Sequence, residues 1–171
     1  VCAARNQTVD AFNKTMSAEN WEIAKQLGLY ARVYPGDPII CTKNHYSSGL
    51  FNGMLGVVRD IENDVMVNWE GSDIDPHTGG PVLQTVPLEA AIDIRLAYAI
   101  TCHKSQGSSA KAVIVVLEDT SFLTREWLYT AITRAETQVI IIGSKDALRM
   151  SVERRTKRVT GFNFLCPADA A

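Results

Sequence analysis

The stretch from residue 97 to residue 134 constrains the fold of this 171-residue chain more than any other. It holds an apolar run that leads into a polar turn at residues 101–107, a second apolar run over residues 112–117, and an amphipathic segment that ends near Arg134. Apolar runs with so few interruptions are typical of strands in a parallel sheet that is covered on both faces. The order strand, strand, helix therefore predicts an α/β fold.

The flanks of this stretch fit the same fold class. A short buried strand is expected over residues 1–4, followed by a helix with Asn6 as its N-cap and with Val9, Phe12 and Met16 on one face. The remaining predicted elements are a short helix or loop over 21–31, strands over 39–43, 96–101, 112–117 and 138–142, and helices over 125–135 and from 144 to about 155.

Residues 54–86 have a different character, because short alternating pieces over 55–60, 65–69 and 82–86 are separated by tight turns. Three or more short strands within about forty residues predict a small β-barrel that is too small to be a full domain. We expect one discontinuous α/β domain over residues 1–47 and 94–171, with a β-barrel insertion over residues 48–93. Trp69 is expected in the core of the barrel, and Trp127 is expected to pack its helix against the sheet.

Composition narrows the partners and the compartment. A net charge of −2 argues against binding of polyanions through bulk charge, so any nucleic-acid contact must come from a local surface. The four cysteines form no Cys-x-x-Cys pair, so a zinc site is not expected, and Cys41 and Cys102 are predicted to be buried, reduced thiols of a cytoplasmic protein. The longest apolar runs are strand-sized, so no membrane partner is expected. Because the chain opens on Val1 rather than methionine, we expect a fragment of a longer protein.

Two interpretations of the polar turn remain open at this point. The turn offers a hydroxyl, an imidazole, a lysine, a glutamine and a glycine just after a strand, where open α/β sheets bind ligands. An exposed strand-to-helix loop would have the same composition. Arg134 also has two interpretations, because a cation in the last turn of a helix is favoured by the helix dipole, whereas a planar guanidinium suits a γ-phosphate.

A pattern of ordered motifs favours the functional interpretation. Residues 97–108 resemble motif V and residues 128–135 resemble motif VI of superfamily 1 helicases, while residues 4–6 together with Asn13 resemble motif IV. Residues 36–44 and 49–58 are similar to the segment that the RecD-like subgroup, the exodeoxyribonuclease V alpha subunit family, carries before its SH3-like insertion. The resemblance covers residues 1 to about 144. It implies a RecA-like parallel sheet of the P-loop NTPase type without the P-loop, which is a second motor domain, with an inserted SH3-like β-barrel.

The resemblance also implies roles for individual residues. Arg134 would be the arginine finger that reaches the γ-phosphate of ATP, and Arg5 would make a second phosphate contact. Gln106, Gly107 and Thr133 would line the nucleotide side, and Thr101, His103 and Lys104 the DNA side. Lys43 and Asn44, with His45 and Tyr46, form a further candidate DNA set, for which a solvated loop is the alternative. Many relatives use an acidic residue two positions after the motif V glycine to bind the nucleotide sugar, and this chain has Ser109 there.

Taken as a whole, the resemblance implies the C-terminal half of an ATP-dependent 5′–3′ DNA helicase that acts in DNA repair and recombination. Its implied partners are single-stranded DNA, the N-terminal RecA-like domain of the same protein and further exonuclease subunits. ATP and Mg²⁺ would be held mainly by that N-terminal domain, because this chain contains no phosphate-binding loop and no strand that ends in Asp-Glu. The chain by itself is therefore expected to be inactive. Two alternatives remain, a nucleic-acid-binding module that does not hydrolyse ATP and the helicase part of a conjugative relaxase.

Overall fold

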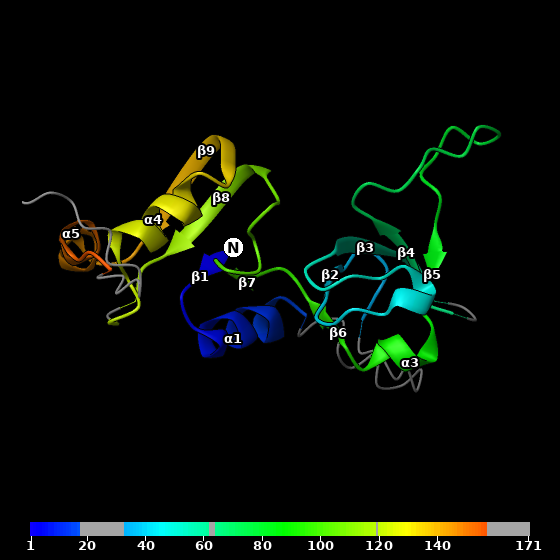
Figure 1. Cartoon of the computed structure of the whole chain (residues 1–171), viewed down its shortest axis with the longest axis horizontal. Coiled ribbons are helices and arrows are strands. Elements are labelled where there is room, and N and C mark those ends of the chain that lie inside the picture. The colour runs from blue at the N-terminus through cyan, green and yellow to red at the C-terminus, as the bar shows by residue number, and fades with distance from the viewer. Residues whose placement is uncertain (18–32, 62–63, 119, 157–171) are drawn as a thin grey trace, which may run out of the picture.

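The computed structural model describes residues 1–17, 33–61, 64–118 and 120–156. They form two sheets that lie side by side (Figure 1). A four-stranded parallel sheet has the order β7-β1-β8-β9, and a five-stranded antiparallel sheet has the order β5-β4-β3-β2-β6. The predicted mixed α/β fold with a parallel sheet is confirmed.

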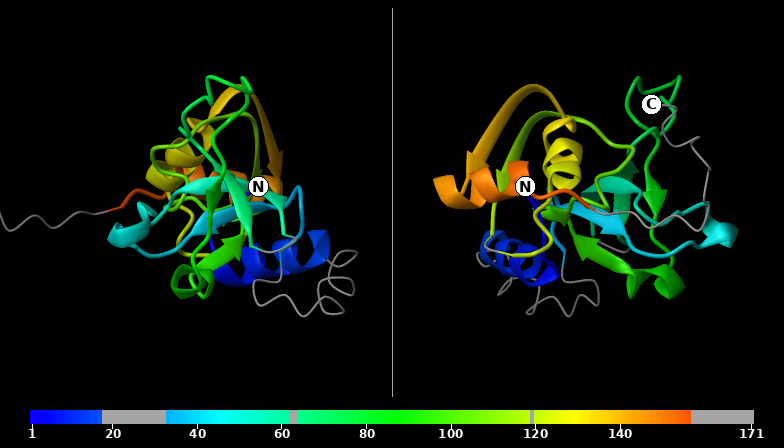
Figure 2. Two further views of the ribbon diagram at one scale, coloured as in Figure 1. Left: turned by 90° about the vertical axis from the view of Figure 1, so that its right-hand side faces the viewer. Right: turned by 60° about the vertical axis from the view of Figure 1, so that its left-hand side comes forward.

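The parallel sheet has helices on both faces. Cys2 and Val115 pack in one apolar cluster with Trp127, whereas their neighbours Ala3 and Val116 pack in another cluster with Val9. Because successive side chains of a strand point to opposite faces, α4 and α5 cover one face and α1 covers the other, as Figure 2 also shows. The elements are β1 Cys2–Ala3, α1 Asn6–Met16, β7 Ile100–Thr101, β8 Ala110–Val116, α4 Arg125–Ile132, β9 Ala135–Ile142 and α5 Lys145–Glu153.

Strand β9 departs from the expected coverage of both faces. Ile140, Ile141 and Ile142 are 42%, 40% and 49% exposed. The reason is the placement of the helices, since α4 contacts β8 and β9 whereas α1 contacts β1 and β7. Among the described residues, the strands that have helices over both faces are those at the centre of the sheet.

The antiparallel sheet has a separate core. Its strands are β2 Pro38–Cys41, β3 Leu55–Asp60, β4 Met66–Trp69, β5 Gln84–Thr85 and β6 Ile94–Leu96, accompanied by the 3₁₀ helix η1 Tyr46–Ser48 and by α3 Leu88–Ala91. Ile39, Val58, Val67 and Trp69 are almost fully buried in this core. The prediction that Trp69 is a core residue is confirmed, and so is the burial of Trp127 on α4.

The single strand predicted over residues 96–101 is wrong. Leu96 ends β6, which pairs with β2 in the antiparallel sheet, and Ile100 begins β7, which pairs with β1 in the parallel sheet. Residues 97–99, here called the crossover, connect the two sheets. The apolar run is continuous in sequence, but its partner strands differ on either side of the crossover. Strands β2 and β6 thus share a sheet with β3, β4 and β5, while the division of the chain into domains stays a prediction.

Several predicted helix details are also corrected. The N-cap of α1 is Arg5, which has an extended backbone, whereas Asn6 is already helical. Met16 is 53% exposed, and the buried positions of α1 are Val9 and Asn13. The helix predicted over 125–135 ends at Ile132, because β9 begins three residues later. The segment predicted over 21–31 lies outside the described residues.

Replacement of Gly56 by alanine is expected to destabilise the antiparallel sheet. Gly56 faces Trp69 across β3 and β4, and a Cβ atom there would lie 2.6 Å from Val67 Cγ1 and 2.7 Å from Trp69 Cε3. Such overpacking typically costs about 1–3 kcal/mol, which urea unfolding of Gly56→Ala would measure. Gly80→Ala is the matched control, since the nearest atom to its Cβ is Thr78 Oγ1 at 3.7 Å. Equal losses in both variants would contradict the packing argument.

Candidate functional site

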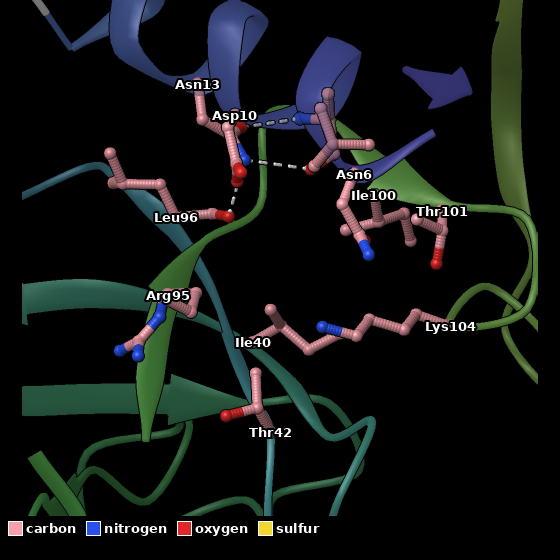
Figure 3. A pocket seen from close by; sticks show the side chains of 12 residues that line it. Asn6, Asp10, Asn13, Ile40, Thr42, Arg95, Leu96, Ile100, Thr101 and Lys104 are labelled. Atoms are coloured by element: carbon pink, nitrogen blue, oxygen red, sulfur yellow. Dashed lines mark hydrogen bonds between the residues drawn. The ribbon is translucent and has the colours of Figure 1, made fainter. Parts of the chain in front are cut away.

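A cleft of about 350 Å³ lies between the two sheets. Figure 3 shows that its walls come from α1, from the antiparallel sheet and from the end of β7. Thr101 and Lys104, two of the residues predicted to contact DNA, line it, and the Lys104 side chain reaches across it toward Ile40. The polar residues that line the cleft are Asn6, Asp10, Asn13, Thr42, Arg95, Thr101 and Lys104.

A hydrogen-bonded turn holds Lys104 at this place. The Lys104 and Ser105 amides both donate to the Thr101 carbonyl, at 2.9 Å and 3.1 Å. The buried Ser105 hydroxyl donates to the Cys102 carbonyl at 2.7 Å. The turn ends at Gly107, whose φ of 94° lies in the left-handed region that favours glycine. The turn over residues 101–107 therefore fixes the position of the Lys104 backbone, from which its side chain extends into the cleft.

The charges in the cleft favour an anionic ligand. Lys104 and Arg95 face a space that holds one carboxylate, that of Asp10. Arg95 Nη1 donates to the Ile92 and Ile94 carbonyls at 2.5 Å and 2.9 Å, which orients its guanidinium. Within the part of the chain that the structure describes, no hydrogen bond or ion pair holds the Lys104 ammonium. The Lys104 ammonium is therefore the group in the cleft that is available to an anion.

Sequence analysis missed Thr42 and Arg95 as cleft residues. Both belong to or adjoin strands of the antiparallel sheet, and they meet Lys104 only because the crossover brings the two sheets together. Arg95 is exposed between the buried Ile94 and the half-buried Leu96, which is the ordinary pattern of a strand with one face toward solvent. No local signal in the sequence separates it from a solvated arginine.

The candidate DNA residues Lys43 and Asn44 lie outside the cleft lining. Lys43 Nζ contacts Asp93 Oδ1 at 3.0 Å, and His45 Nε2 lies 3.2 Å from Asp93 Oδ2. The hydrogen bond from Lys43 is the largest cause that holds the pKa of Asp93 below its ordinary value. The Asn44 side chain is held within its own loop. Its Nδ2 donates to the Tyr46 hydroxyl at 3.1 Å, and its Oδ1 accepts from the Asn52 backbone amide at 2.8 Å.

Arg134 lies just beyond the C-terminal end of α4 and is half-buried. Its Nε donates to the Thr130 carbonyl, and its Nη1 donates to the Ser108 carbonyl, both at 3.3 Å. Thr133, the C-cap residue, donates its hydroxyl to the same Thr130 carbonyl at 3.1 Å. The guanidinium is therefore attached to the segment that follows Lys104, and Gln106 and Gly107 lie exposed in that segment.

Ser109 stands where the resemblance implies an acidic residue, and the carboxylate of another residue, Glu136, lies beside it. The Ser109 hydroxyl donates to Glu136 Oε1 at 2.5 Å. Glu136 lies at the start of β9, two residues after Arg134. The sequence contains this glutamate, but only the pairing of β8 with β9 places it beside Ser109.

The structure does not bring Arg5 and Arg134 together. The Arg5 amide donates to Glu118 Oε2 at 3.1 Å, beyond the C-terminal end of β8, and the Thr8 hydroxyl donates to the same carboxylate. The Ser108 carbonyl that binds Arg134 precedes the N-terminal end of β8. A strand of this length spans roughly 20 Å, so the two arginines flank opposite ends of it. His103 is exposed in the turn and is not part of the cleft lining.

The cysteines of the described residues, Cys2, Cys41 and Cys102, are free and buried, as predicted for Cys41 and Cys102. The hydrogen bond between the Cys2 and Cys102 thiols, together with burial, raises the pKa of Cys102. In the described ranges, no group of three or more histidine, cysteine, aspartate or glutamate residues could hold a metal ion. No helix in the same ranges is long and apolar enough to cross a membrane.

Comparison with known proteins relates the chain to helicases. The model of the UvrD-like helicase C-terminal domain matches residues 96–142. The RecBCD enzyme subunit RecD of Mycolicibacterium smegmatis is 34% identical over 94% of this chain and 28% of its own length. The ATP-dependent RecD2 DNA helicase of Deinococcus radiodurans is 33% identical over 71% of this chain and 16% of its own length. The chain thus spans less than a third of these relatives.

A structural comparison agrees at the level of the fold. The Pif1 helicase from Bacteroides, solved in complex with ADP-AlF3 and single-stranded DNA, superposes with a TM-score of 0.54 and 19% identity. The superposition covers 83% of this chain and 39% of the other.

Proposed function

We propose that this chain, which by its sequence relationships is the C-terminal half of a RecD-like superfamily 1 helicase, belongs to an ATP-dependent enzyme that travels 5′–3′ along single-stranded DNA. The observation that carries the proposal is the course of one segment. Residues 101–109 begin in the cleft at Thr101 and Lys104, and near their end the Ser108 carbonyl accepts a hydrogen bond from the Arg134 guanidinium. One short segment thus touches both proposed ligand sites.

The parallel sheet with α1, α4 and α5 would be the second RecA-like motor domain, and the antiparallel sheet would be its SH3-like insertion. Because β2 and β6 pair within the antiparallel sheet, the insertion in this proposal includes residues 33–96 rather than residues 48–93 alone. The partner would be the N-terminal RecA-like domain of the same protein, which would hold ATP and Mg²⁺. In complexes of the exonuclease type, further subunits would complete the assembly in the cytoplasm.

At the nucleotide side, Arg134 would supply the positive charge that stabilises the phosphoryl group during transfer. Its two hydrogen bonds to backbone carbonyls orient the guanidinium through Nε and Nη1, and among the described residues Nη2 donates to no protein acceptor. Gln106, Gly107 and Thr133 would form the surrounding surface. Arg5 would act at the other end of β8, next to Glu118, and would therefore meet a different part of the bound ligands from Arg134.

At the DNA side, the Lys104 ammonium and the Thr101 hydroxyl would contact backbone phosphates, with Thr42 and Arg95 on the opposite wall. His103, exposed in the same turn, would contact the strand outside the cleft. Lys43 forms an ion pair with Asp93, and Asn44 is hydrogen-bonded within its loop. Their contacts with DNA would therefore be weaker than that of Lys104. Closure and opening of this domain against the N-terminal motor domain would be passed to the cleft through residues 101–109 and would step the strand.

Glu136 would replace the acidic residue that many relatives carry at the position of Ser109. The Ser109 hydroxyl orients this carboxylate, which could accept hydrogen bonds from the two hydroxyls of a ribose. The nucleotide sugar would then be recognised from β9 rather than from the motif V segment.

Arg134→Ala tests the proposed arginine finger in the full-length protein. DNA-stimulated ATP hydrolysis is expected to fall by about 10³-fold or more, because such an arginine contributes about 10³–10⁵ to turnover in related systems. Affinity for single-stranded DNA should stay near normal. Arg149→Ala, an exposed arginine on α5, is the matched control and should keep full turnover. Retained turnover in Arg134→Ala would refute the assignment, and a wild-type protein that binds DNA without hydrolysing ATP would favour the non-hydrolysing module.

Lys104→Ala tests the phosphate contact. Its affinity for an oligothymidine strand should fall, and the slope of log K against log salt should become shallower by about 0.7, the value for one contact on a single strand. Lys145→Ala, an exposed lysine at the start of α5, should leave both quantities unchanged. An affinity loss with an unchanged slope would rule out a phosphate contact for Lys104.

Glu136→Gln tests the sugar contact. Wild-type protein should hydrolyse ATP with a lower KM than dATP, because the 2′-hydroxyl donates to the carboxylate. The variant should lose most of this preference, while kcat changes little. Glu153→Gln, at the far end of α5, is the control. If the ratio of the two KM values is the same in Glu136→Gln and in wild type, Glu136 does not bind the sugar.

A further inference from the structure

The crossover is the short connection on which the cleft depends. Residues 97–99 leave β6 in the antiparallel sheet and enter β7 in the parallel sheet. Thr42 and Arg95 lie on the first side of the connection, and Thr101 and Lys104 lie on the second. Any change in the path of these three residues would alter the spacing between the two walls.

One buried side chain holds the crossover from the side of α1. Asn13 Nδ2 donates to the Leu96 carbonyl at 2.9 Å and to the Ala99 carbonyl at 3.0 Å, and Asn13 Oδ1 accepts from the Ala99 amide at 2.8 Å. An amide side chain supplies two donors and an acceptor, so Asn13 satisfies one backbone group at the end of β6 and two in the crossover. A carboxylate of the same shape could not donate to either carbonyl.

A side chain of the crossover itself, that of Tyr98, binds the segment that leads into the antiparallel sheet. The Tyr98 hydroxyl donates to Asp37 Oδ1 at 2.7 Å, and Asp37 Oδ2 accepts from the Tyr34 amide at 2.8 Å. Asp37 is only 1% exposed. Burial, followed by the hydrogen bond to Asp37, raises the pKa of Tyr98 to about 12, so the hydroxyl keeps its proton at neutral pH. The Ala97 amide adds a bond of 2.7 Å to the Pro38 carbonyl.

We infer that Asn13 and Tyr98 are positioning residues that fix the spacing between the Lys104 wall and the Arg95 wall of the cleft. Asn13 ties the crossover to α1 on the parallel sheet, and Tyr98 ties it to the antiparallel sheet. Figure 3 shows Asn13 at the upper edge of the cleft, with its bonds directed at the connecting segment. The inference rests on the proposed function in one respect, namely that the ligand held between these walls is single-stranded DNA.

The test uses Asn13→Leu and Tyr98→Phe in the full-length protein, because neither change adds a charge to the cleft. Each change removes hydrogen bonds to the crossover and keeps the size of the side chain. The KM for single-stranded DNA in the ATPase assay is expected to rise about tenfold, which corresponds to the upper range for one buried hydrogen bond. The kcat at saturating DNA should stay within about twofold, because Arg134 is not moved directly, and the number of base pairs unwound per ATP should fall.

A control separates positioning from general destabilisation. Val67→Ala removes buried volume from the antiparallel sheet and leaves the crossover bonds intact. At equal loss of thermal stability, it should leave the KM for DNA and the coupling of hydrolysis to unwinding unchanged. If Val67→Ala raises the KM as much as Tyr98→Phe does, or if both positioning variants keep the wild-type KM, the inference is overturned.

Hydrogen exchange distinguishes failure of the inference from failure of the proposed function. In Asn13→Leu, the amides of residues 97–101 should exchange faster than in Val67→Ala, whereas those of β2 should not differ between the two. This result does not depend on DNA or ATP. A wild-type protein without DNA-stimulated hydrolysis would refute the proposed function, and unchanged exchange at residues 97–101 would refute the positioning role on its own.

Discussion

The arrangement of this molecule depends on how three consecutive residues satisfy their backbone polar groups while passing from one sheet to another. Residues 97–99 belong to no strand, so neither sheet provides a complete ladder for their backbone groups, and at the buried Ala99 an unpaired group would cost about as much as a lost hydrogen bond. Asn13, the Asp37 carboxylate and the Pro38 carbonyl bind this segment from different directions. The path of the chain is thereby set, and with it the angle at which the two sheets meet.

The length of β8 separates the two proposed ligand sites. Arg134 and Glu136 lie near its N-terminal end, while the cleft with Lys104 adjoins β7, which is level with the other end through the pairing of Cys2 with both Ile100 and Val115. The segment 102–109 runs back along this distance, from the end of β7 to the start of β8. In the proposed helicase, a displacement of Arg134 would therefore be passed to the DNA side through a segment held at its start by the Thr101 carbonyl.

The pattern of apolar residues predicted those strands whose own sequence is sufficient to define them. The piece at residues 112–117 is apolar over its full length and the piece at residues 55–60 is apolar in its first part, and β8 and β3 appear there. The burial of Trp69 followed from the same pattern. The break at residues 97–99 could not be predicted in this way, because both halves of the run are apolar and only their partner strands, β2 and β1, differ. The contact of Lys43 with Asp93 likewise joins residues that are fifty positions apart.

The position of Asn13 shows why the missed features lie at the centre of the candidate site. Asn13 follows Val9 by four residues and precedes Met16 by three, so helical periodicity puts it on the face that Val9 and Met16 share, but a polar residue there gives no apolar signal of burial. In the structure Asn13 is buried and Met16 is exposed, because the Asn13 side chain binds the backbone of the crossover. A cleft between two sheets requires irregular backbone at its edge, and irregular backbone requires buried polar side chains. A residue such as Asn13 is therefore missed when apolar side chains alone are taken as the sign of a buried helix position.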